Sequence, residues 1–314
     1  MGSNTPHLLS PDGSGLAEAA AILRAGGLVA VPTETVYGLA ARADSDDAVA
    51  AIYRAKGRPD FNPLIVHVPD AQAAARIADL DDAAHALAAA FWPGPLTLVL
   101  PRRADAGLAA AVTAGLPTVA VRVPAHPLMR ALLAEAGMPL AAPSANRSGA
   151  VSPTTPAHVA ASLGSRVDAI LDGGACERGI ESTIVAVRPG GGWQVLRPGP
   201  ITAQQVAAVL GRDEDAPGEE RIEAPGQLAS HYAPGKPVRL GARTAAADEF
   251  HIGFADVTGD VTLSATGDLA EAAARLYACL HRAADAAQPK VAIAPVPDDG
   301  IGAAINDRLR RAAA

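Results

Sequence analysis

The sequence predicts an α/β protein with two domains, a larger one built on a twisted mixed sheet and a smaller one that follows it. Short apolar runs of strand character alternate with helical patterns over residues 15–204. The chain has 314 residues, more than a single hydrophobic core usually organises. Residues 211–236 combine charge, proline and glycine, which is typical of a linker. The predicted boundaries are therefore 12–210, 211–236 and 237–314.

The first elements follow from start and stop signals in the chain. Residues 16–25 are predicted to form a helix that ends at Gly26, because a left-handed C-terminal cap costs glycine least. The apolar run at 28–32 predicts a short buried strand. Ser45 is placed to cap a helix with two aspartates in its first turn, which ends near Gly57.

The remaining elements continue this alternation. In the first domain, strands are predicted at 64–68, 96–101, 118–124, 139–142, 169–171, 182–187 and 193–197. Helices are predicted at about 70–91, 126–136, 155–163 and 202–210. Some neighbouring strands are too close in the sequence for a parallel crossover, so the sheet should be mixed. After the linker, strands are predicted near 237–241, 250–255, 260–265 and 290–296, with helices at 268–286 and 301–313.

The composition argues against several classes of protein. The net charge of −7 is wrong for a general nucleic-acid coat, which needs a basic surface. Cys176 and Cys279 are far apart and form no C-x-x-C pair, so neither a disulfide framework nor a thiolate metal site is expected. Without a recognisable secretion signal or an apolar run of membrane length, we expect a cytoplasmic protein. The usual glycine-rich phosphate-binding motifs are also missing, so a nucleotide would be held by side chains and irregular loops.

Polar side chains gather in loops directly after apolar strands, where α/β folds keep their binding sites. These clusters are Pro32–Leu39, Lys56–Pro63, Ala141–Gly149 with Ser152 beyond it, Gly179–Ile184 and Leu196–Gly199. Each has an ordinary structural explanation as a turn, a helix end with favourable cations or the exit of a strand. A single histidine in a strand, such as His67, is usually a core or solvent-facing residue.

Arg122 stands inside the otherwise apolar strand 118–124 and needs a partner there. A buried carboxylate of the protein and a ligand carboxylate held bidentately explain it equally well. With Lys56, Arg58 and Arg197, it gives the first domain four cations at loop or strand-end positions. Such a concentration suits an anionic ligand with several charges.

Taken in order, these clusters resemble the motifs of the YrdC domain family. The matching segments within residues 15–204 are Pro-Thr-Glu-Thr-Val-Tyr-Gly-Leu, Lys-Gly-Arg-Pro, Asn-Pro-Leu-Ile-Val-His, Trp-Pro-Gly-Pro-Leu-Thr, Pro-Ser-Ala-Asn-Arg-Ser-Gly, Glu-Ser-Thr-Ile and Leu-Arg-Pro-Gly. The tail is similar to the long form of the family, through Ser230–Pro234 and the ending 302–311. The resemblance implies a YrdC-like domain followed by a smaller Rossmann-like one. We expect this second domain to be short, because its first two strands leave little room for a helix between them.

The resemblance also implies an activity, the synthesis of L-threonylcarbamoyladenylate. Threonine and bicarbonate form a carbamate, whose oxygen attacks the α-phosphorus of ATP to give threonylcarbamoyl-AMP and pyrophosphate. A partner transferase would then move the threonylcarbamoyl group to a tRNA adenosine beside the anticodon. Mg²⁺ is expected as a cofactor held mainly by the ATP phosphates. Joining two anions in this way depends on cations and positioning more than on a strong base.

Carried over position by position, the motifs of the family assign roles to individual residues. Threonine would be held by Thr35, His67, Arg122, Ala142 and Ser182, and its carboxylate by Arg122. ATP would be held by Arg58, Asn62, Thr118, Ser144, Ser152 and Arg197. Lys56 and Arg58 are the expected catalytic residues, through their charge near the phosphates. The linker residues His231 and Tyr232 would fold over the nucleotide as a lid.

Two alternatives fit part of the pattern. A carbamoyl-transferring maturation enzyme contains the same domain, but after acylphosphatase and zinc-finger segments that the short N-terminal stretch and two cysteines do not provide. A non-catalytic RNA-binding or ribosome-assembly module would use the same basic concave surface. The acidic net charge and the 3% of aromatic residues count against that module.

Overall fold

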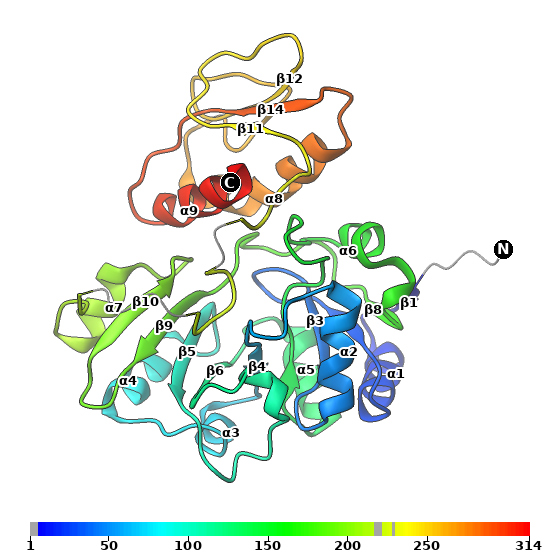
Figure 1. The fold of residues 1–314 in the computed structure, drawn as a ribbon, viewed down its shortest axis with the longest axis vertical. Coiled ribbons are helices and arrows are strands. Elements are labelled where there is room, and N and C mark those ends of the chain that lie inside the picture. The colour runs from blue at the N-terminus through cyan, green and yellow to red at the C-terminus, as the bar shows by residue number, and fades with distance from the viewer. Residues whose placement is uncertain (1–5, 217–221, 228–229) are drawn as a thin grey trace.

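A computed structural model describes residues 6–216, 222–227 and 230–314 (Figure 1). Within these residues the chain forms a ten-stranded mixed sheet and a four-stranded parallel sheet, each accompanied by helices. The predicted α/β class with a mixed sheet is thereby confirmed. The predicted linker at 211–236 is covered only in part, since 217–221 and 228–229 lie outside the described residues.

The larger sheet is formed by the first two thirds of the chain. Its strands are β1 (His7–Leu9), β2 (Val29–Val31), β3 (Gly38–Arg42), β4 (Ile65–His67), β5 (Leu96–Pro101), β6 (Thr118–Arg122), β7 (Leu140–Ala141), β8 (Ala169–Leu171), β9 (Thr183–Val187) and β10 (Trp193–Arg197). They lie side by side in the order β1-β8-β2-β3-β7-β4-β6-β5-β9-β10. The accompanying helices are α1 (Gly13–Arg24), α2 (Asp46–Lys56), α3 (Ala71–Ala75), α4 (Asp82–Phe91), α5 (Pro127–Ala136), α6 (Pro156–Leu163) and α7 (Ala203–Leu210).

Strand pairing brings distant motifs together. β4 runs parallel to β6, with His67 opposite Arg122. Side chains in register on neighbouring strands point to the same face of a sheet, so these two share a face. Both strands end at these residues, at the carboxyl edge where α/β sheets hold their ligands.

Two features of the larger domain differ from the prediction. The chain turns after β2 and returns antiparallel to it as β3, where the sequence suggested only a turn. This strand is Gly-Leu-Ala-Ala-Arg, a composition with little β-propensity that becomes a strand through its neighbours. The single helix predicted at 70–91 is two helices, because the Asp81 carboxylate accepts the backbone N–H of Ala84 and starts a second one.

The smaller domain is a four-stranded parallel sheet with two helices. Its elements are β11 (Val238–Arg239), β12 (Glu249–Gly253), β13 (Val261–Thr262), α8 (Leu269–Asp285), β14 (Lys290–Ile293) and α9 (Gly302–Ala313). The strand order is β11-β14-β12-β13. Residues 240–248, all of them described, contain no helix, in agreement with the short connection expected there.

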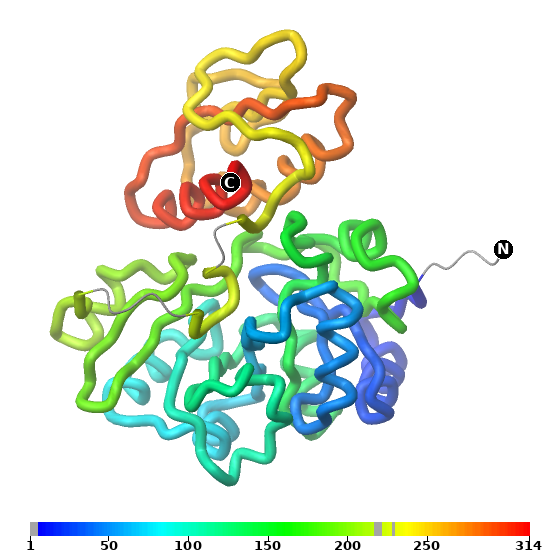
Figure 2. Tube along the Cα trace, in the orientation of Figure 1, coloured from blue at the N-terminus to red at the C-terminus, as the bar shows by residue number. Residues whose placement is uncertain are grey.

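The two domains meet through α8 and α9, which lie between the small sheet and the larger domain (Figures 1 and 2). Val36, Val151 and Ile180 of the larger domain belong to the same buried apolar cluster as the inner faces of these helices. Gly179 adopts a φ of +62° and lies so close to α8 that a Cβ would overlap the backbone of Ala274. The contact is therefore apolar and close-packed.

Candidate active site

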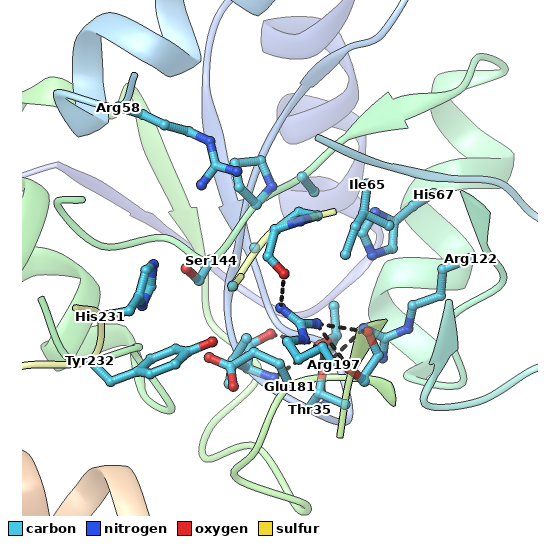
Figure 3. Close-up of a pocket in the computed structure, with 18 residues that line it drawn as sticks. Thr35, Arg58, Ile65, His67, Arg122, Ser144, Glu181, Arg197, His231 and Tyr232 are labelled. Atoms are coloured by element: carbon cyan, nitrogen blue, oxygen red, sulfur yellow. Dashed lines mark hydrogen bonds between the residues drawn. The ribbon is translucent and has the colours of Figure 1, made fainter. Parts of the chain in front are cut away.

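A small cavity, with about 40 Å³ of water-accessible space, lies between the strand-end loops of the larger sheet and the described parts of the linker (Figure 3). It is lined by Thr33, Thr35, Val36, Gly38, Arg58, Ile65, His67, Arg122, Ala142, Pro143, Ser144, Glu181, Ser182, Arg197, Pro225, Gly226, His231 and Tyr232. Figure 3 shows Arg58 and His231 on one side of the cavity and His67 and Arg122 on the other.

Ten of the fourteen residues predicted for the site line this cavity: Thr35, Arg58, His67, Arg122, Ala142, Ser144, Ser182, Arg197, His231 and Tyr232. The other four, Lys56, Asn62, Thr118 and Ser152, are not part of its wall. Proximity does not establish what each residue binds, so the assigned roles remain predictions.

Arg122 is paired with a carboxylate of the protein. Its Nη2 lies 2.5 Å from Oε1 of Glu34, and its Nη1 donates to the Thr35 hydroxyl at 3.0 Å. Nε donates to the backbone carbonyl of Gly94. Burial raises the pKa of Glu34, but the positive charge of Arg122 and the hydrogen bonds to the carboxylate lower it by more. The net pKa lies below the ordinary value, so the carboxylate is ionised. A guanidinium has five N–H groups, and among the described residues three are used here, which leaves two for a ligand.

Ser182 and Arg197 form a second buried unit, joining the start of β9 to the end of β10. Arg197 donates from Nε and Nη2 to the Ser182 carbonyl and from Nη2 to its hydroxyl, at 3.0–3.2 Å. The Ser182 hydroxyl is also 2.8 Å from that of Thr97 in β5. Burial lowers the pKa of Arg197, which nevertheless stays a cation because arginine starts so high.

Arg58 is held by the loop that follows α2. Its Nη2 donates to the Asn62 side-chain oxygen at 2.6 Å and to the Pro63 carbonyl at 2.9 Å. Burial lowers the pKa of Arg58 to about 10, so it remains charged at neutral pH. Asn62 thus reaches the cavity through Arg58, which it orients.

Lys56, predicted as catalytic, lies behind the wall of the cavity. Its Nζ donates to the backbone carbonyls of Ser144 and Asn146, at 2.6 and 2.5 Å. Burial and the nearby Arg58 lower its pKa well below the usual range. In this arrangement the amine fixes the loop that presents Ser144 to the cavity.

Thr118 and Ser152 are also set back from the cavity. Thr118 begins β6 and Arg122 ends it, about 13 Å apart at the usual rise of a strand. Ser152 donates its hydroxyl to Oε1 of Glu181 at 2.5 Å, and so contacts a wall residue rather than the cavity itself.

Two histidines present unpartnered nitrogens in this region. Nδ1 of His67 and Nδ1 of His231 are buried without a hydrogen-bond partner among the described residues. Burial lowers the pKa of each ring to about 3, so both are neutral at pH 7. A buried nitrogen without a partner is unfavourable unless a ligand or water completes it, and both rings line the cavity.

The linker closes one side of the cavity. Tyr232 has a φ of +64°, rare for a residue with a side chain, and its ring is buried against His231 and Tyr277. Gly226, at φ +87°, lies where a Cβ would press on Arg197 and on the Tyr232 hydroxyl. This tight fit shows that the described linker is part of the wall.

The sequence-based assignment omits Glu34 and Glu181. Both are buried, one pairing with Arg122 and the other lining the cavity. Each stands beside an assigned residue inside a recognised motif, next to Thr35 and Ser182. A glutamate beside a hydroxyl residue inside a recognised motif is therefore the signal that marks them.

Comparisons with known proteins agree with this geometry. A family model of Sua5, YciO and YrdC proteins, described as "Telomere recombination", matches residues 21–199, and one described as "Threonylcarbamoyl-AMP synthase, C-terminal domain" matches 201–314. The threonylcarbamoyl-AMP synthase of Bacillus subtilis is 47% identical over 246 residues, covering 74% of this chain and 68% of that protein. The protein of that name from Pyrococcus abyssi is 42% identical over 224 residues, covering 69% and 64%.

A solved structure extends the likeness to both domains. The crystal structure of Pyrococcus abyssi Sua5 complexed with L-threonine superposes with a TM-score of 0.87 and 32% sequence identity, covering 98% of this chain and 97% of that one. No helix in the described part of the chain is long and apolar enough to cross a membrane. The matched models and the two-domain superposition show that this chain belongs to the Sua5/YciO/YrdC family, in the long form that carries a second, C-terminal domain.

Proposed function

We propose that the protein joins L-threonine, bicarbonate and ATP into threonylcarbamoyl-AMP and pyrophosphate; the name of its relatives, threonylcarbamoyl-AMP synthase, supports this product. The observation that carries this proposal is the cavity with Arg122 on one side and Arg58 on the other, closed by the linker. Such a cavity suits two anionic reactants that must meet between separated cations.

Threonine would occupy the side formed by Thr35, His67, Arg122, Ala142 and Ser182. The two unused N–H groups of Arg122 are enough for a bidentate hold on its carboxylate. The Thr35 and Ser182 hydroxyls and the open nitrogen of His67 offer further hydrogen bonds. The relative solved with L-threonine supports this choice of ligand.

ATP would occupy the side with Arg58, Ser144 and Arg197. Both arginines are charged and at most 8% exposed. Charges in a site with so little water interact with phosphate more strongly than surface charges do. Lys56 would contribute by fixing the Ser144 loop, and Asn62 by orienting Arg58.

The reaction needs no strong base from the protein. The threonine nitrogen adds to the bicarbonate carbon with loss of water, and a carbamate oxygen then bonds to the α-phosphorus as pyrophosphate leaves. The cavity supplies cations and hydroxyls to align these groups and to offset the charge of the leaving pyrophosphate.

Mg²⁺ would accompany the nucleotide. Glu181 is the carboxylate in the cavity wall, and both its oxygens already accept hydrogen bonds. These residues therefore fit an ion that is held mainly by phosphate oxygens, and whose chemistry would be to neutralise their charge.

The product would serve the threonylcarbamoyl modification of tRNA, through a separate transferase. The alternative function, a non-catalytic RNA-binding module, is not favoured. Arg122 and Arg197 are each only 4% exposed, so they do not form the open basic surface that a nucleic-acid backbone needs.

Release of pyrophosphate from ATP tests the proposal. With Mg²⁺ supplied, we expect release only when threonine and bicarbonate are both present, because the carbamate is the attacking group. Reactions that lack one of the two are the controls. Release without threonine, or none from the complete mixture, would contradict the proposed reaction.

A further inference from the structure

Glu181 is a buried carboxylate that connects the two domains. It is 5% exposed, lines the cavity and immediately precedes Ser182. Oε1 accepts the hydroxyl of Ser152, and Oε2 accepts the Tyr277 hydroxyl at 2.6 Å and Nε of Arg308 at 2.9 Å. Tyr277 is on α8 and Arg308 on α9, so the smaller domain supplies two of the three partners of Glu181.

Arg308 reaches three separate parts of the active site. Besides Glu181, its Nη2 donates to the Pro198 carbonyl at 2.9 Å, one residue beyond Arg197. Its guanidinium carbon lies 5.3 Å from the ring centre of Tyr232 in the linker. The side chain is 0% exposed, and Asp307 takes another of its N–H groups at 2.6 Å.

The residues that Arg308 contacts are the immediate chain neighbours of two residues in the cavity wall. Glu181 and Pro198 are the chain neighbours of Ser182 and Arg197, which are hydrogen-bonded to each other in the cavity wall. A guanidinium that fixes both neighbours sets the spacing of this pair. Only its planar fork serves several acceptors in fixed directions, which a lysine ammonium does not do.

Stability alone does not explain such an arrangement. A buried ion pair is often no more stabilising than well-packed apolar side chains, because both charges lose their hydration. Arg308 lies in a domain that presents no residue of its own to the cavity wall, among the described residues. Its contacts all lead to groups at that wall or beside it, except for the Asp307 pair.

We propose that Arg308 is a positioning residue, through which the C-terminal domain sets the Ser182–Arg197 pair and holds the Tyr232 linker against the cavity. This inference rests on the proposed function, since it assigns the second domain a part in that same site. It gives α9 a purpose that its sequence pattern does not reveal.

The test compares three variants of the full chain. Arg308→Lys keeps the positive charge beside Glu181 but loses the fork, Arg308→Met loses both, and Arg310→Met is the matched control, two residues along α9 and exposed. Thermal unfolding, kcat and KM for threonine and ATP are measured for each. We expect kcat/KM to fall about tenfold in Arg308→Lys and about a hundredfold in Arg308→Met, with higher KM for both substrates. Arg310→Met should match the unsubstituted protein.

The lysine variant separates positioning from structural support. If Arg308 were only structural, activity would fall only in variants that lose thermal stability. A stable Arg308→Lys with unchanged kcat and KM would therefore overturn the inference. If Arg308→Met does not fold, Tyr277→Phe replaces it. That change removes one hydrogen bond to Glu181 but keeps the Arg308 ion pair, and should raise KM about threefold with a smaller loss of stability than Arg308→Met.

Failure of this inference is distinguishable from failure of the proposed function. If the unsubstituted protein releases no pyrophosphate, the reaction is wrong, and calorimetric binding of threonine and ATP then tests Arg308. We expect about tenfold weaker binding in Arg308→Lys, as the same change in ligand alignment demands. Equal affinities in Arg308→Lys and the unsubstituted protein would refute the positioning role.

Discussion

The pairing of Arg122 with Glu34 decides how this arginine works. The sequence left a protein carboxylate and a ligand carboxylate equally plausible, and the structure shows the first, with donors left for the second. Glu34 also accepts the backbone N–H of Ala125 with its other oxygen. The carboxylate therefore orients the guanidinium toward the cavity and offsets part of the cost of its burial.

Replacing Arg122 by alanine should weaken threonine binding far more than ATP binding. The expected loss is about a hundredfold for threonine, because a buried charge-assisted contact disappears, and a few-fold for ATP. Calorimetric titration of each ligand measures both. Similar losses for the two ligands would identify Arg122 as a structural residue.

The same variant should also be less stable. Glu34 would remain buried without its partner, which costs about 3–5 kcal/mol in comparable ion pairs. Glu34→Gln with Arg122→Met removes both charges and is the matched control for this effect.

Prediction from sequence succeeds at residues that stand out against their surroundings. Arg122 in an apolar strand and the ordered motifs pointed to ten of the residues that line the cavity. Prediction from sequence misses side-chain orientations that depend on packing between distant parts of the chain. Lys56 looks like a phosphate ligand in the sequence, yet its amine is turned to two carbonyls near residue 145.

At the scale of elements, the alternation of apolar runs and helical patterns predicted most helices, whereas β3 escaped prediction. Asp81 shows that a capping residue inside an apolar pattern can divide one expected helix into two. β3 has no pattern of its own because both its faces are covered, and strands buried in this way lose alternation. The contact of the two domains could not be predicted, since it joins Gly179 to a helix about a hundred residues later.

Gly179→Ala tests that contact. The new Cβ would meet the α8 backbone at Ala274, and the φ of +62° disfavours any side chain, so we expect α8 to shift away from the larger domain. Limited proteolysis should cut the linker faster, and kcat/KM should fall at least tenfold because Arg308 moves with its domain. Gly211→Ala is the control for strain alone, since that glycine has a φ of +65° but open space around it. Equal behaviour of the two variants would contradict a close-packed domain contact.

At the scale of the whole molecule, buried neutral histidines should make stability depend on pH. Burial lowers the pKa of His67 and His231 to about 3 and that of His158 to about 4, from an ordinary 6.5. Below pH 6.5 the unfolded chain takes up protons that the folded chain does not, so the free energy of unfolding falls as the pH falls. The loss continues until the folded pKa values are reached, near pH 3–4.

Urea unfolding at pH 7.5 and at pH 5.5 measures this effect. Between these two pH values, His67 and His231 together should lower the free energy of unfolding by about 2–3 kcal/mol, at about 1.4 kcal/mol per ring and pH unit below pH 6.5. This window lies above the range where the carboxylates take up protons, so Glu181, with a pKa of about 2, does not contribute. A free energy of unfolding that stays constant or rises toward pH 5.5 would show that these rings are not buried neutral.

The whole fold places Arg58 and Arg122 on opposite sides of one cavity, with the second domain behind its linker wall. In the proposed reaction the bicarbonate carbon becomes part of the product, linked to threonine and AMP. Mass spectrometry of a reaction with threonine, ATP, Mg²⁺ and ¹³C-bicarbonate tests it most directly. We expect a threonylcarbamoyl-AMP ion that is heavier by the one labelled carbon than the ion from unlabelled bicarbonate. An unlabelled adenylate of threonine itself, or no adenylate at all, would contradict it.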